Sequence, residues 1–136
     1  ALTHQAMSVA LPARQAAGGF VSRFRSVPAT SYATAVVVLY VLTMIMGASI
    51  YPEYRVYIRI AMEQNQFWKT HGAFEMKEHV TAIGLGLLPV YWYFWKRPDH
   101  GHIARTRKWL TVLFASIVWF SFLVGHVANN VRGFGS

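Results

Sequence analysis

The stretch from Ser31 to Tyr51, SYATAVVVLYVLTMIMGASIY, decides the fold class, because it contains no charged side chain. An α-helix rises about 1.5 Å per residue, so about 20 apolar residues cross the roughly 30 Å hydrocarbon core of a bilayer. A second stretch of this kind runs from Trp109 to Val127, WLTVLFASIVWFSFLVGHV, with His126 as its only titratable group. Both runs are continuously apolar and do not alternate with polar residues, which excludes a membrane β-barrel. The two stretches predict membrane-spanning helices.

A third, less uniform stretch lies between them. Its apolar run from Val80 to Trp95 is too short to span alone, so it must recruit the preceding turn, which holds Glu75, Lys77, Glu78 and His79. Ionisable side chains at that depth mark functional sites by default. The sequence therefore predicts an all-α integral membrane protein with three transmembrane helices, at about 31–51, 76–95 and 109–127.

The composition supports a membrane location. The chain has 136 residues, enough for one domain, with 54% hydrophobic and 13% charged residues and a mean hydropathy of +0.30. So small a chain cannot bury this much apolar surface, and the excess must face lipid or other subunits. The absence of cysteine from the sequence excludes disulfides, thiolate metal sites and a cysteine nucleophile.

The basic residues predict the orientation. Eight of them lie in the N-terminal segment and in the loop between the second and third spans, with Asp99 as the one acid: Arg14, Arg23, Arg25, Lys96, Arg97, Arg105, Arg107 and Lys108. The other side holds five basic residues and four acids. By the positive-inside rule the N-terminus is inside and the C-terminus outside, in a bacterial cytoplasmic membrane or the mitochondrial inner membrane. Anionic lipids are the expected neighbours of the basic loop, and nucleic-acid binding is not expected.

Residues 1–30 form a basic segment that precedes the three-helix domain of residues 31–136. A helix over Ala17–Val27 would place five apolar residues on one face: Ala17, Phe20, Val21, Phe24 and Val27. Such a face is typical of an amphipathic helix that lies on a membrane surface. We predict this arrangement on the inner surface, with a basic tail held by lipid headgroups as the alternative.

The predicted topology gathers polar residues on the outer side. Pro52 is expected to end the first span, where Glu53 and Arg55 reach water. His71, Glu75 and His79 follow at intervals of four, which aligns them along one stripe of a helix, and His126 enters from the third span.

Two metal-based chemistries fit these residues. His79 and His126 could supply the two axial imidazoles of a b-type haem, one from each of two facing helices. Alternatively, His71, Glu75 and His79 could bind copper, zinc or iron. In the third interpretation, these residues form a structural polar cluster or a subunit contact. The chain alone then binds no cofactor tightly.

Function is expected to lie in assembly. No catalytic or nucleotide-binding motif is present, and three spans are too few to build an inverted-repeat transporter. We predict a non-catalytic accessory subunit that packs against other subunits of a respiratory or photosynthetic electron-transfer complex. The alternative is a small haem- or metal-binding membrane cytochrome. In length and span number the chain resembles the three-span membrane anchors of succinate dehydrogenase, a resemblance that implies no particular site residues.

Overall fold

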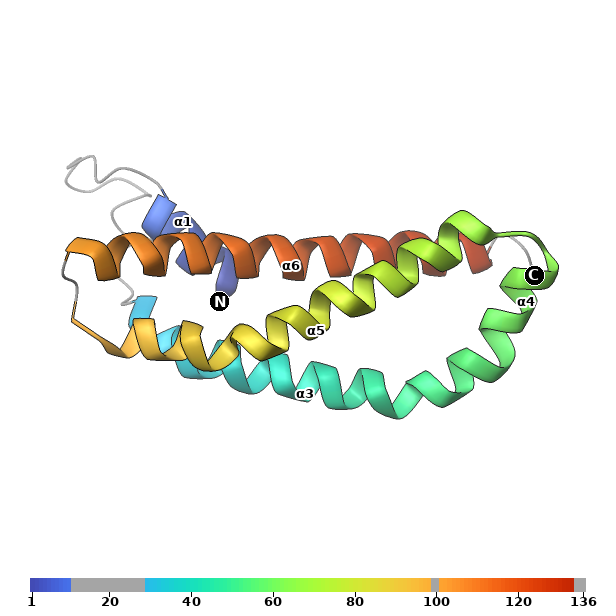
Figure 1. The fold of residues 1–136 in the computed structure, drawn as a ribbon, viewed down its shortest axis with the longest axis horizontal. Helices are drawn as coiled ribbons and strands as arrows, with labels where there is room; N and C mark the ends of the chain where they lie inside the picture. The colour runs from blue at the N-terminus through green and yellow to red at the C-terminus, as the bar shows by residue number, and fades with distance from the viewer. Residues whose placement is uncertain (11–28, 99–100, 134–136) are drawn as a thin grey trace. The chain divides into compact units, whose positions relative to one another are not determined.

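The computed structural model describes residues 1–10, 29–98 and 101–133, and this part of the chain contains helices and no strand (Figure 1). Three helices are long: α3 (Tyr32–Glu53), α5 (Trp68–Lys96) and α6 (Gly101–Gly133). The shorter elements are α1 (Leu2–Ala10), the 3₁₀ turn η1 (Ala29–Ser31), the π-helical turn η2 (Tyr54–Ile58) and α4 (Arg59–Gln64). The all-helical prediction is confirmed.

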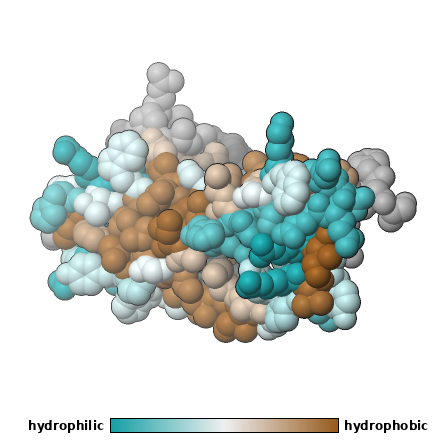
Figure 2. Space-filling view, turned by 45° about the vertical axis from the view of Figure 1, so that its right-hand side comes forward, coloured by the Kyte–Doolittle hydropathy of each residue, from teal (hydrophilic) through white to brown (hydrophobic). Residues whose placement is uncertain are grey.

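Two stretches are long and apolar enough to cross a membrane, Ala29–Gln64 and Gly101–Asn130. They contain the first and third predicted spans. In each of them, 17% of the most apolar 18-residue segment is buried. The core helix of a soluble protein would instead be mostly buried. Figure 2 shows apolar side chains, in brown, over much of the visible surface.

The regular α-helix α3 ends at Glu53, one residue after Pro52, but the chain remains helical beyond it. Proline lacks an N–H and its ring crowds the preceding turn, which usually kinks or ends a helix. Here α3 contains Pro52, and the π-helical turn η2 and then α4 carry the chain on to Gln64. The regular α-helical pattern thus changes to the wider π-helical turn shortly after the proline, and the chain stays helical.

The chain packs as two compact units, each built from parts of all three long helices. Unit 1 comprises residues 1–39 and 87–116, as far as they are described. At its core, the rings of Tyr91 and Phe114 are fully buried, with centroids 4.9 Å apart. Trp95 Nε1 donates a hydrogen bond to Thr111 Oγ1 at 3.0 Å and so satisfies the indole inside this core.

Helix α1 belongs to unit 1 through a glutamine. The side chain of Gln5 is fully buried; its Nε2 donates to the Ala29 carbonyl at 2.8 Å, and its Oε1 accepts a hydrogen bond from the Tyr91 hydroxyl. A buried amide needs such partners to offset its lost hydration. The predicted surface helix over 17–27 lies outside the described residues, so α1 is the helix that the structure adds to the N-terminal segment.

Unit 2 comprises residues 40–86 and the described part of 117–136. The Tyr40 hydroxyl donates to the Thr81 carbonyl at 2.8 Å, and the Thr81 and Ser121 hydroxyls lie 2.8 Å apart. These bonds connect α3, α5 and α6, and small or hydroxyl side chains at such contacts are typical of helices that pack within membranes.

Candidate functional site

The π-helical turn carries Tyr54 into the core of unit 2. Tyr54 is 8% exposed, and its ring stacks on that of Phe74 from α5, with centroids 4.1 Å apart. Its hydroxyl lies 3.5 Å from His71 Nδ1. π-Helical turns occur often at functional positions, because they redirect a side chain that a regular helix would place elsewhere.

A group of polar side chains surrounds this contact, and we call it the His71 cluster: Tyr54, Arg59, Glu63, His71 and Glu75. His71 Nε2 lies 3.2 Å from Glu75 Oε1 and 3.8 Å from Glu63 Oε1. Arg59 Nε donates to Glu63 Oε1 at 2.9 Å, and Arg59 Nη1 is 3.7 Å from Glu75 Oε1. The cluster therefore ties η2, α4 and the first turns of α5 together.

One neutral tautomer of His71 is compatible with both of its closest neighbours. With the proton on Nε2, the imidazole donates to the Glu75 carboxylate, and Nδ1 faces the Tyr54 hydroxyl. The His71 side chain is 10% exposed, whereas the side chains of Glu63 and Glu75 are 36% and 44% exposed. The buried imidazole is thus covered by carboxylates that reach solvent, an arrangement that can relay a proton or simply satisfy a buried ring.

His79 does not join this cluster. It is exposed, and its Nδ1 lies 2.7 Å from the Glu75 carbonyl within the same helix. Because a carbonyl only accepts, this contact places the proton on Nδ1 and the lone pair on Nε2, which is the nitrogen that a metal would take.

His126 is also exposed and contacts its own helix. Its ring stacks on Phe122, and Asn130 Nδ2 lies 3.2 Å from His126 Nε2. An amide N–H directed at Nε2 occupies the lone pair that an axial haem ligand would need.

The predicted stripe of His71, Glu75 and His79 thus divides into a side-chain pair and a separate residue. His71 and Glu75 meet through their side chains, while His79 meets only the backbone of Glu75. Within residues 1–10, 29–98 and 101–133, no three or more His, Asp or Glu side chains are placed together as metal ligands.

Arg59 and Glu63 were missed by the sequence interpretation. The available signal was a pair of opposite charges four residues apart, which is typical of neighbours on a helix. That signal carries weight only if the helix continues past Pro52, which the sequence interpretation did not expect.

Comparison of the chain with models of protein families, with curated proteins and with solved structures gave no match.

Proposed function

We propose that this chain is a non-catalytic accessory subunit, with three membrane spans, of a larger electron-transfer complex in an energy-converting membrane. One observation carries the proposal: large apolar side chains are exposed along α3 and α6, where a soluble protein would bury them. On α3 these are Val38, Leu39, Val41, Leu42, Ile45, Met46 and Ile50; on α6 they are Trp109, Leu113, Val118, Trp119, Phe122, Leu123 and Val127.

Helix α5 is proposed to be the remaining membrane span, in addition to those in α3 and α6. Its 29 residues would extend about 43 Å at 1.5 Å each, which exceeds the hydrocarbon thickness. At its C-terminal end, Lys96 Nζ lies 5.7 Å from the centre of the Trp92 ring, and the Arg97 guanidinium lies 4.7 Å from that of Tyr93. Cations paired with aromatic rings suit a membrane–water interface, where one end of the group is wet and the other apolar.

The two packing units differ sharply in charge, which supports the proposed orientation. The sequence of unit 1 holds eight Lys and Arg residues and one acid, whereas unit 2 holds five and four. The positive-inside rule then assigns the N-terminal segment and the basic residues around the start of α6 to the cytoplasmic or matrix side. The N-terminus lies inside and the C-terminus outside in this proposal.

The topology can be tested directly, because the chain has no native cysteine. We expect Asn65→Cys, in the turn between α4 and α5, to react with a membrane-impermeant maleimide from the outside. His102→Cys, at the start of α6, should react only after the membrane is opened. Equal reactivity of the two positions in intact membranes would show that α5 does not cross the bilayer.

The assignment to an electron-transfer complex rests on the histidines and on the resemblance in size to known anchor subunits. Its test is purification of the tagged full-length chain from its own membranes in a mild detergent. We expect other integral subunits and redox cofactors to accompany it in a fixed stoichiometry. Recovery of the chain alone, or with partners whose ratio varies between preparations, would contradict the proposal.

The second candidate function is a small b-type cytochrome in which His79 and His126 ligate haem, which requires the Asn130 amide to turn away from His126 Nε2. The Nδ1 contact of His79 favours it, because it leaves Nε2 of that residue with its lone pair. The same preparation tests it. Reduced-minus-oxidised spectra should show a sharp α-band that disappears in His79→Ala. Metal analysis of the isolated chain tests the alternative, a metal ion bound by His71, Glu75 and His79. A colourless and metal-free chain would contradict both.

A further inference from the structure

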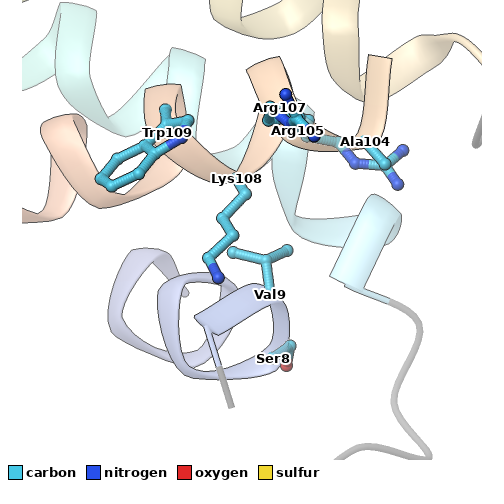
Figure 3. A pocket seen from close by; sticks show the side chains of 7 residues that line it. All are labelled: Ser8, Val9, Ala104, Arg105, Arg107, Lys108 and Trp109. Carbon is cyan, nitrogen blue, oxygen red and sulfur yellow. The ribbon is translucent and has the colours of Figure 1, made fainter. Parts of the chain in front are cut away.

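Unit 1 contains a cavity of about 540 Å³ between α1 and the first turns of α6. Its lining consists of Ser8, Val9, Ala104, Arg105, Arg107, Lys108 and Trp109. Figure 3 shows Lys108 extending from α6 toward α1, where Val9 and Ser8 lie. Three of the seven lining residues are cations, and none is an acid.

Acidic side chains are scarce in the unit that holds this cavity. The described residues of unit 1 contain no Asp or Glu, and Asp99 is the single acid in its full sequence ranges. Among the described residues of unit 1, the cavity therefore concentrates positive charge with no carboxylate to balance it, and such a site attracts anions.

The cations differ in how firmly they are held. Arg107 is 8% exposed, and its guanidinium lies 5.0 Å from the centre of the Trp95 ring, so it forms a fixed, buried charge in the wall. Arg105 is exposed and Lys108 is partly exposed, so both can move toward a ligand. Guanidinium and ammonium groups together with a hydroxyl are the usual recognition set for phosphate.

One lining residue distinguishes between sources of phosphate. The Trp109 side chain is 65% exposed at the edge of the cavity, at the start of the apolar run of α6. An exposed tryptophan in that position is typical of the headgroup region of a bilayer. A free phosphate ester would gain nothing from it, whereas a phospholipid would place its acyl chains along the apolar surface beyond.

We propose that this cavity binds the phosphate group of an anionic membrane lipid, with Arg105, Lys108 and Ser8 at the headgroup and Trp109 at the glycerol level. The proposal rests on the membrane location proposed above, and it does not depend on membership of a complex. It replaces a diffuse attraction between basic residues and lipid with one defined site.

The test uses the full-length chain in nanodiscs of phosphatidylcholine with increasing phosphatidylglycerol, read out by native mass spectrometry of retained lipid. Arg105→Gln with Lys108→Gln is compared with Arg55→Gln with Lys69→Gln, which removes the same charge from exposed positions of unit 2. We expect about a 25-fold loss of phosphatidylglycerol affinity in the first pair, since each direct charged contact with the phosphate contributes about 1 kcal/mol, a factor of roughly five. The second pair should change the affinity less than threefold.

Three outcomes would contradict the proposal, each in a different way. Equal losses in the two pairs would show that net charge, and not the cavity, selects the lipid. Saturable binding of inorganic phosphate to the chain in detergent, without preference for phosphatidylglycerol in discs, would assign the cavity to a soluble phosphate. A chain that fails to enter discs of either lipid would contradict the membrane location itself, and so the proposed function.

Discussion

Gly84→Ala is expected to destabilise the protein by about 3 kcal/mol. A Cβ at Gly84 would overlap the Tyr40 hydroxyl oxygen and lie 3.3 Å from Ile117 Cγ2, so the ring of Tyr40 must move. Overpacking of this kind costs roughly 1–3 kcal/mol. The movement also breaks the bond from Tyr40 to the Thr81 carbonyl, worth about 1 kcal/mol.

The matched control lies two residues away on the same helix. A Cβ at Gly86 meets no atom within 4 Å, so Gly86→Ala should stabilise the protein by up to about 1 kcal/mol through helix propensity. Unfolding of the full-length chain in detergent, followed by circular dichroism, measures both. Adding Tyr40→Phe to Gly84→Ala should recover part of the loss, because it removes the nearest clashing atom. Effects of the same sign at the two glycines would contradict the packing at Gly84.

The opposite responses expected at these two glycines show where sequence reasoning reaches its limit. Both lie in one apolar stretch and both read as ordinary small residues of a membrane helix. Only the approach of Tyr40, from a segment more than forty residues earlier, makes one of them indispensable. Helical class and apolar runs follow from local composition, whereas a contact between helices depends on which faces meet.

The His71 cluster also combines a contact that local spacing predicts with one that depends on how separate segments meet. His71 and Glu75 were expected to lie together because a spacing of four places them on one face of any helix. The approach of Glu63 depends on the tight turn after α4, where Gln66 adopts a positive φ of 59°. Glycine or asparagine usually marks such a conformation, so a glutamine there gives no warning of the turn.

Helix α1 was also beyond prediction, for a related reason. Its sequence is rich in alanine and looks like part of a basic tail, and a buried glutamine helps to anchor it. Gln5 is informative only once Tyr91 and the Ala29 carbonyl are seen to face it. A buried polar side chain of this kind has no periodic pattern that would announce it.

Substitutions of two phenylalanines of α6 should affect two different properties, the stability of the chain in one case and its assembly with partners in the other. Phe114 is fully buried against Tyr91, whereas Phe122 is 61% exposed and packs edge-on against Trp119, with ring centroids 5.9 Å apart. Phe114→Ala should lower the free energy of unfolding in detergent by about 3 kcal/mol, the lower end of the range for buried phenylalanine. The lower end of the range applies because lipid or detergent is as apolar as the protein interior. The substitution therefore mainly removes packing contacts and little hydrophobic stabilisation.

Phe122→Ala should leave the stability of the isolated chain nearly unchanged. If the exposed aromatic face of α6 contacts another subunit, the same substitution should reduce the yield of partners in the copurification by several-fold, since large aromatic side chains dominate such interfaces. Phe114→Ala at a temperature where it remains folded should retain those partners. If neither variant loses its partners, this face of α6 meets lipid. The subunit contact would then be expected on α3, where Leu42, Ile45 and Met46 are also exposed.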